Sequence, residues 1–182
     1  SQGVDSGLKD TATGQPITLY LEGGKVVGYV GNNTGSKAFE LSLNGSSVTL
    51  AQFSPIEHAQ KGGQAADYDD VMSLATGLVT LTATATDKDG DTASYTLDIS
   101  NKVQFHDDAV WAPVGSAAGM SVFAESALTG GAQTPTGSLG TTASVDFSTA
   151  FTVAYGADGA ASSNALVYAL GVQSQGVDRG LK

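Results

Sequence analysis

Apolar and polar residues alternate most clearly over residues 79–86, with the sequence VTLTATAT. A period of two sustained over eight residues predicts a half-buried β-strand with its threonines on one face. Residues 93–99, ASYTLDI, alternate in the same way. The residues between these segments, DKDGD, therefore form the tip of a predicted hairpin, in which Gly90 supplies a permissive backbone.

The same pattern recurs along the chain, and it predicts two further hairpins and two single strands. The hairpins pair 17–22 with 25–30 and 38–43 with 47–53, and the single strands cover 144–156 and 165–172. No long amphipathic helix is predicted, and residues 57–75 are expected to form a loop or a short helical turn. Many short strands separated by turn residues predict an all-β fold, an antiparallel β-sandwich of immunoglobulin-like or related type.

Composition narrows the possible functions. The 182 residues are 41% hydrophobic, which suffices for a buried core, and eight basic against eighteen acidic residues give a net charge of −10. Nucleic-acid binding is disfavoured, because a phosphate-binding surface needs clustered Lys and Arg. No apolar run approaches the roughly 18–20 residues of a membrane span, so no membrane insertion is expected. The chain has no cysteine, which excludes disulfides and thiolate catalysis.

The chain repeats itself at its ends. Residues 1–9 read SQGVDSGLK and residues 174–182 read SQGVDRGLK, so that eight of nine positions are identical at an offset of 173 residues. This spacing predicts a tandem array. A copied tag would also give matching ends, but the difference between Ser6 and Arg179 argues against it.

A second boundary is predicted inside the chain, where VQFHDD is followed by small residues and Pro113. Residues 1–106 then form the C-terminal part of one module, 107–113 the inter-repeat linker, and 114–182 the N-terminal part of the next module. Alternatively, the two parts fold together as one permuted sandwich, cut across a repeat boundary.

The aspartates are unevenly distributed, since nine of the fourteen lie between Asp67 and Asp108. Asp87, Asp89 and Asp91 share the predicted hairpin tip, where Ca²⁺, a hard cation that takes six to eight oxygens, would relieve their repulsion. Asp107 and Asp108 lie at the module boundary and could complete the shell of a tip site. The tip is no EF-hand, because strands flank it and Gly90 is at loop position four. A solvated turn is the alternative, and it is preferred for Asp67, Asp69 and Asp70.

Evidence for catalysis is weak. His58 and His106 are the only histidines, and two histidines far apart in the sequence do not indicate a zinc site. His58 is expected to be a packed or hydrogen-bonded structural residue. The chain contains no nucleophile elbow, P-loop or dinucleotide fingerprint, and the run GADGAASS at 156–163 is explained as a glycine-rich turn. No catalytic residue and no enzymatic activity are predicted.

Several segments together resemble a known family. Residues 3–31, 48–58, 69–99, 105–109 and 151–181 resemble the large tandem repeat module of bacterial type I-secreted RTX adhesins, sometimes catalogued as a domain of unknown function. The resemblance implies a secreted, calcium-stabilised sandwich at the bacterial cell surface, with Ca²⁺ at Asp87, Asp89, Asp91, Asp107 and Asp108. One departure is Ala109-Val110, where the family often has proline.

The expected function is therefore that of a structural extender repeat, which holds the ligand-binding tip of a giant adhesin away from the cell in adhesion and biofilm formation. Its expected partners are neighbouring repeats of the same polypeptide, and the isolated chain is expected to be monomeric. The alternative is a sugar- or peptide-binding adhesin module, which an exposed aromatic platform would support. Trp111, the only tryptophan, is expected to pack near the linker instead.

Overall fold

A computed structural model describes residues 2–59, 70–106, 120–122, 142–155 and 159–173. The regular structure of the described residues consists of strands and two single-turn 3₁₀ helices, η1 (Ser100–Lys102) and η3 (Ser148–Ala150). The strands are β1 (Val4–Lys9), β2 (Pro16–Glu22), β3 (Lys25–Val30), β4 (Lys37–Asn44), β5 (Ser47–Gln52), β6 (Val71–Ser73), β7 (Val79–Thr86), β8 (Thr92–Asp98), β9 (Val103–His106), β10 (Met120–Val122), β11 (Thr142–Asp146) and β12 (Leu166–Val172).

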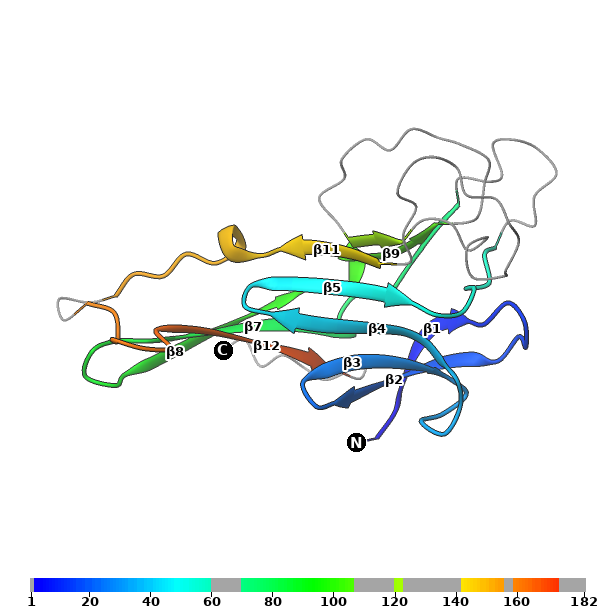
Figure 1. The fold of residues 1–182 in the computed structure, drawn as a ribbon, viewed down its shortest axis with the longest axis horizontal. Coiled ribbons are helices and arrows are strands. Elements are labelled where there is room, and N and C mark those ends of the chain that lie inside the picture. Colours follow the sequence, from blue (N-terminus) through cyan, green and yellow to red (C-terminus); the bar gives the residue numbers. More distant parts are fainter. Residues whose placement is uncertain (1, 60–69, 107–119, 123–141, 156–158, 174–182) are drawn as a thin grey trace.

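These strands form three sheets (Figure 1). The largest has six strands in the order β1-β2-β3-β4-β5-β11, and two three-stranded sheets have the orders β10-β9-β6 and β12-β7-β8. Every pairing is antiparallel except that of β10 with β9, which is parallel. The hairpins β2–β3, β4–β5 and β7–β8 confirm the three predicted from the alternation of residues and from their turns.

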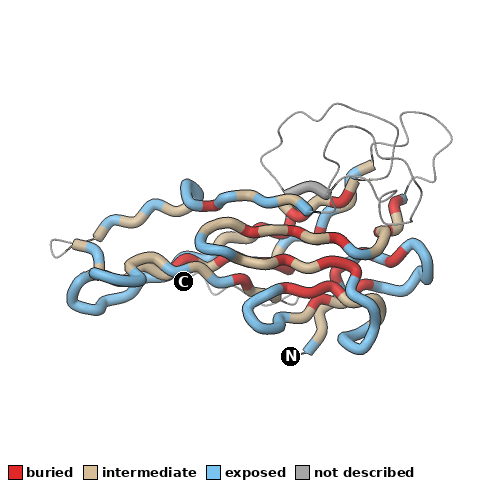
Figure 2. Tube along the Cα trace, in the orientation of Figure 1, coloured by how far each residue is buried: buried red, intermediate tan, exposed pale blue. Residues whose placement is uncertain are grey.

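The core lies where the six-stranded sheet packs against the two smaller sheets. In β5 alternate residues are buried, among them Val48 and Leu50. Phe39 of the large sheet contacts Phe105 of β9, with ring centroids 5.0 Å apart. Figure 2 shows buried residues concentrated in the middle of the sheets and an exposed β7–β8 end. Buried residues of the six-stranded sheet and of both smaller sheets form one shared core, which holds the layers together. The predicted all-β antiparallel sandwich is therefore confirmed.

Strands from the C-terminal part of the sequence complete sheets begun by the N-terminal part. β11 pairs with β5 from Thr142↔Ala51 to Asp146↔Ser47, and β12 pairs with β7 along its whole length. Phe147, which follows β11, is buried in the shared core. The described parts of both segments thus share hydrogen-bonded sheets within one chain. Their assignment to successive repeats, and the linker at 107–113, stay predictions.

Two predictions about local structure need correction. The predicted strand at 144–156 ends at Asp146, because the chain turns into η3 and continues as irregular backbone. Within 57–75, predicted as loop or helical turn, residues 71–73 form β6, which pairs with β9. This strand is only three residues long, too short for its alternation to be recognised in the sequence. Of the helices in the described part of the chain, none has the length and apolar character needed to span a lipid bilayer.

Candidate metal centre

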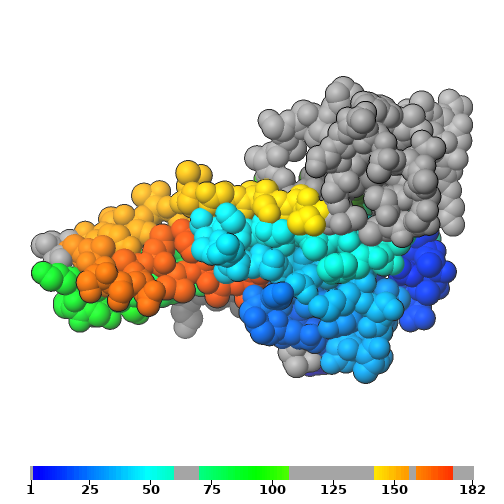
Figure 3. Space-filling view, viewed as in Figure 1, coloured from blue at the N-terminus to red at the C-terminus, as the bar shows by residue number. Residues whose placement is uncertain are grey.

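The candidate site is at the free end of the β7–β8 hairpin. The two strands pair from Thr80↔Asp98 to Thr86↔Thr92, so the tip comprises residues 87–91. Figure 1 shows this tip at one end of the long axis of the molecule. In the space-filling view it protrudes there beside the segment that leads into β12 (Figure 3). The predicted hairpin therefore presents its aspartates at an exposed end of the sandwich.

Asp87 organises the backbone of the tip. Its Oδ1 accepts hydrogen bonds from the backbone N–H of Gly90 at 3.1 Å and of Asp91 at 2.8 Å, and its own N–H donates to the carbonyl of Asp91 at 3.0 Å. Gly90 has a φ of +101°, a conformation that residues with a Cβ rarely adopt. These hydrogen bonds and the glycine define the conformation of the tip.

A segment far away in the sequence also holds the tip. The backbone N–H of Lys88 donates to the carbonyl of Gly159 at 3.0 Å, and the N–H of Ala161 donates to the carbonyl of Thr86 at 3.1 Å. Asp87 and Ala160 form an antiparallel bridge. Sequence analysis missed this contact and treated GADGAASS as an isolated turn. The glycines of that run were the available signal, since a backbone that docks against another strand favours small residues.

Three carboxylates converge at this tip. Asp87, Asp89 and Asp91 each offer an oxygen within 4.8 Å of the others, with Asp87 half-buried and the other two exposed. The pKa of Asp87 is lowered and that of Asp89 is raised, because a hydrogen bond between the two carboxyl groups keeps the shared proton on Asp89 and because the charge of Asp87 opposes ionisation of Asp89. Two carboxylates that compete for one proton are suited to share a cation instead.

The chemistry of this donor set matches a hard divalent cation. Carboxylates bind calcium through one or both oxygens, so three aspartates supply about three to six of the six to eight ligands that Ca²⁺ takes. Exposed positions leave room for water to fill the remaining places. The set contains no imidazole or thiolate, which zinc sites favour. The residues at the tip therefore fit Ca²⁺ better than a transition metal.

Two other described aspartates, Asp98 and Asp70, do not lie at the tip. Asp98 lies at the opposite end of β8, where its carboxylate accepts hydrogen bonds from the N–H of Gly77 at 2.8 Å and the hydroxyl of Ser100 at 2.6 Å. Asp70 is half-buried beside β6. Asp67, Asp69, Asp107 and Asp108 lie outside the described residues, and their proposed roles stay predictions.

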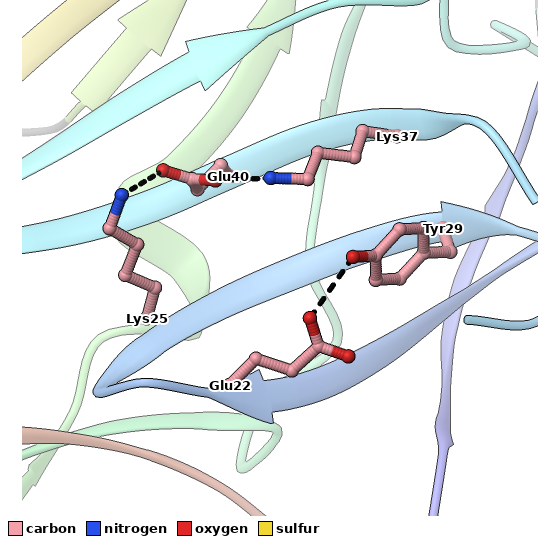
Figure 4. Close-up of polar contacts among 5 residues, drawn as sticks. All are labelled: Glu22, Lys25, Tyr29, Lys37 and Glu40. Atoms are coloured by element: carbon pink, nitrogen blue, oxygen red, sulfur yellow. Dashed lines mark hydrogen bonds and ion pairs between the residues drawn. The ribbon is translucent and has the colours of Figure 1, made fainter. Parts of the chain in front are cut away.

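Two lysines form ion pairs on the six-stranded sheet, away from the tip. Glu40 of β4 forms ion pairs with Lys25 at 2.7 Å and with Lys37 at 2.8 Å, and these lysines hold the pKa of Glu40 below its ordinary value (Figure 4). Beside them, the hydroxyl of Tyr29 donates to Glu22 at 3.0 Å. These contacts lie on the six-stranded sheet, so two of the eight basic residues are engaged away from the tip.

The histidines occupy structural positions. His58 is buried, as predicted for a packed histidine, and His106 lies in β9 opposite Val71. Glu57 beside His58 is only half-buried, and its backbone N–H donates to the carbonyl of Lys9 at 2.7 Å. The local backbone therefore runs antiparallel to the end of β1, with a bridge between Ile56 and Asp10.

A shallow groove lies on the same half of the molecule as the tip. It has a volume of about 410 Å³ and is lined by residues of β7, β8, β12 and the segment after η3, including Ala83, Tyr95, Phe151 and Leu166. Tyr95 is 65% exposed and packs edge-on against Phe151, with ring centroids 6.2 Å apart. Phe151 in turn meets Tyr168 at 5.5 Å. Trp111 lies outside the described residues.

Comparison with known proteins places the chain in a family. Residues 1–100, more than half of the 182, match the family described as Domain of unknown function (DUF5801). No curated protein and no solved structure matches the chain. The matched part contains β1 to β8 and the acidic tip, whereas β11 and β12, which complete two of the sheets, lie beyond it. The chain is thus a member of the DUF5801 family.

Proposed function

We propose that this protein is a calcium-stabilised extender repeat of a large bacterial surface adhesin, secreted by a type I system, and that it is not an enzyme. The observation that carries the proposal is the convergence of Asp87, Asp89 and Asp91 within 4.8 Å at the exposed end of a sandwich. Two features of the sequence support it: the near-identical ends, offset by 173 residues, and the resemblance to RTX adhesin repeats.

The proposed mechanism is electrostatic. Without a cation, ionised carboxylates at the tip repel one another, in a chain that already carries a net charge of −10. Ca²⁺ bound between them replaces repulsion by attraction and stabilises the folded form by mass action, by about 1.4 kcal/mol at a concentration tenfold above Kd. Extracellular calcium modules bind with Kd values of about 10⁻⁴–10⁻³ M. Such a site fills outside the cell and stays largely unfilled in the cytoplasm during export.

A second ion at Asp107 and Asp108 belongs to the same proposal. The resemblance assigns these residues to the joint between repeats, and each repeat would contribute one such pair. An ion held there would restrict bending between neighbours in the polypeptide. The two positions have separate roles, since the tip ion stiffens a hairpin and the joint ion fixes the angle between modules.

Calcium titration of the whole 182-residue chain tests the proposal. Isothermal titration calorimetry and thermal melting should show binding and a rise in melting temperature with CaCl₂, reversed by EGTA, and a weaker response to MgCl₂. Asp89→Asn should weaken the binding at the tip, because Asp89 supplies charge. Asp5→Asn is the matched control, since it removes the same charge at an exposed site in β1. A melting temperature that does not respond to calcium in the unsubstituted chain would contradict the proposal.

A second candidate function, binding of sugar or peptide, is favoured by the exposed face of Tyr95 beside the 410 Å³ groove. Aromatic rings of this kind contact the apolar faces of sugars and peptide side chains. Binding of the chain to a glycan array, abolished by Tyr95→Ala but retained by Asp89→Asn, would favour this function over the extender. Equal signals from the unsubstituted chain and the Tyr95→Ala variant would exclude the groove as the binding site.

A further inference from the structure

The repeated nonapeptide contains a complete strand of the sandwich. Residues 4–9 form β1, which lies at the edge of the six-stranded sheet and pairs with β2 through Val4↔Leu19, Asp5↔Thr18 and Lys9↔Pro16. The chain therefore carries two β1 sequences: the one that occupies this position, and the copy at 174–182. The position beside β2 sets structural requirements against which both sequences can be compared.

Most of these requirements are met by both copies. A Cβ on Gly3 would lie 2.5 Å from Thr18 Cγ2, and Gly7 has a φ of +76°, so both positions need glycine. Leu8 is 2% exposed and belongs to the core. The second copy keeps all three residues, as Gly176, Gly180 and Leu181.

The single difference falls on a fully buried polar position. Ser6 is fully buried, and its hydroxyl donates to the carbonyl of Ile17 at 2.6 Å and accepts from the N–H of Leu8 at 3.1 Å. The register with β2 shifts between Asp5 and Lys9, so the hydroxyl satisfies backbone groups where the pairing is irregular. The second copy has Arg179 here. A guanidinium in this place would be a buried permanent charge and would remove both hydrogen bonds.

We propose that the sixth residue of the nonapeptide determines which sheet the strand can complete. A strand with serine fits beside β2 of this module. A strand with arginine is excluded from that position. In a tandem polypeptide with near-identical strands, this difference keeps the arginine strand out of this module. The inference depends on the repeat and on the packing of Ser6, and not on calcium.

A rescue experiment on the full chain tests the proposal. In the Ser6→Arg variant, both copies of the nonapeptide carry arginine at the sixth position. Its melting temperature should fall by about 10 °C, since a chain of this size loses about 2–4 °C for each kcal/mol lost from the free energy of unfolding. The double variant S6R/R179S moves the serine strand to the C-terminal copy, which should restore most of the loss. The matched control S6R/R179K keeps a charge at position 179 and should not restore it. R179S alone should melt like the unsubstituted chain.

Light scattering during size-exclusion chromatography of S6R/R179S will show whether the serine strand beside β2 comes from the same molecule or from a second one. A monomer means that it comes from the same chain, and a dimer means that it comes from a second copy; either result, with the melting temperature restored, supports the proposal. Two results would overturn it. One is an S6R variant that melts like the unsubstituted chain, and the other is an S6R/R179S variant that is no more stable than S6R.

Discussion

Replacing Ser100 by alanine should loosen the base of the hairpin that carries the acidic tip. Ser100 is fully buried, and its Oγ accepts hydrogen bonds from the backbone N–H of Leu78 at 3.0 Å and of Val79 at 2.9 Å. The same hydroxyl donates to Asp98 Oδ1 at 2.6 Å. One side chain thus joins η1 to the start of β7 and to the end of β8, the two strands that must be held together for the tip to form.

The expected cost follows from these contacts. Ser100→Ala leaves two buried N–H groups without the oxygen that accepts from them, and each such group costs about 1–3 kcal/mol. Partial relaxation and entry of water reduce the sum, so we expect a loss of about 3 kcal/mol in the free energy of unfolding. For a chain of this length, that corresponds to a fall of about 10 °C in melting temperature.

Urea unfolding followed by circular dichroism measures this loss. Ser94→Ala is the matched control, because Ser94 lies on the same hairpin but is exposed, with its hydroxyl 2.7 Å from that of Thr84. The control should change the free energy of unfolding by less than about 0.5 kcal/mol. If Ser100→Ala is as stable as Ser94→Ala, then the buried hydroxyl does not hold the hairpin base, and the reasoning is refuted.

Three further predictions concern packing and pH. Gly28→Ala should cost about 1–3 kcal/mol in urea unfolding, because the new Cβ would lie 2.7 Å from the ring of Phe39, which is fully buried and cannot move aside. Asp10 is buried, which opposes its ionisation, but hydrogen bonds from Ser54 and Thr13 outweigh this and lower its pKa. The ionised Asp10 therefore stabilises the fold above its ordinary pKa of 3.8, and this stabilisation is lost as the pH falls below that value. Asp10→Asn should make the stability less dependent on pH in this acidic range. The pKa of Asp89 is raised, so its contribution to stability in EGTA has the opposite sign: it is present below the ordinary value of 3.8 and lost as the pH rises through the raised pKa. Asp89→Asn should remove that loss.

Local features of the sequence predicted much of the fold. Alternation with period two located β7 and β12, and Asn44-Gly45 located the turn between β4 and β5, because both signals act over a few neighbouring residues. The convergence of Asp87, Asp89 and Asp91 followed from the hairpin alone, since alternate residues of a short tip lie close together.

Long-range pairing could not be predicted in the same way. The contact of β11 with β5 joins residues more than 90 positions apart, and the bridge between Asp87 and Ala160 joins residues more than 70 apart. No local pattern specifies either partner, because such contacts depend on which exposed strand edge remains when the rest of the sheet has formed.

The end of β11 at Asp146 is likewise set by a contact with a residue far away in the sequence. The carboxylate of Asp146 accepts from the N–H of Ser148 at 2.8 Å and from the hydroxyl of Ser46, which turns the chain away from the sheet although its residues still alternate.

Under the proposed function, the structure limits what calcium would do. The hydrogen bonds of Asp87 and the backbone of Gly159 to Ala161 hold the tip, and the core lies in other parts of the sheets. An ion would therefore bind to a preformed loop and would lose little free energy in ordering it. This differs from small metal domains that fold only when the metal binds. Under the proposed function, calcium would stiffen an already folded sandwich, and its removal would loosen the hairpin end before it unfolded the core.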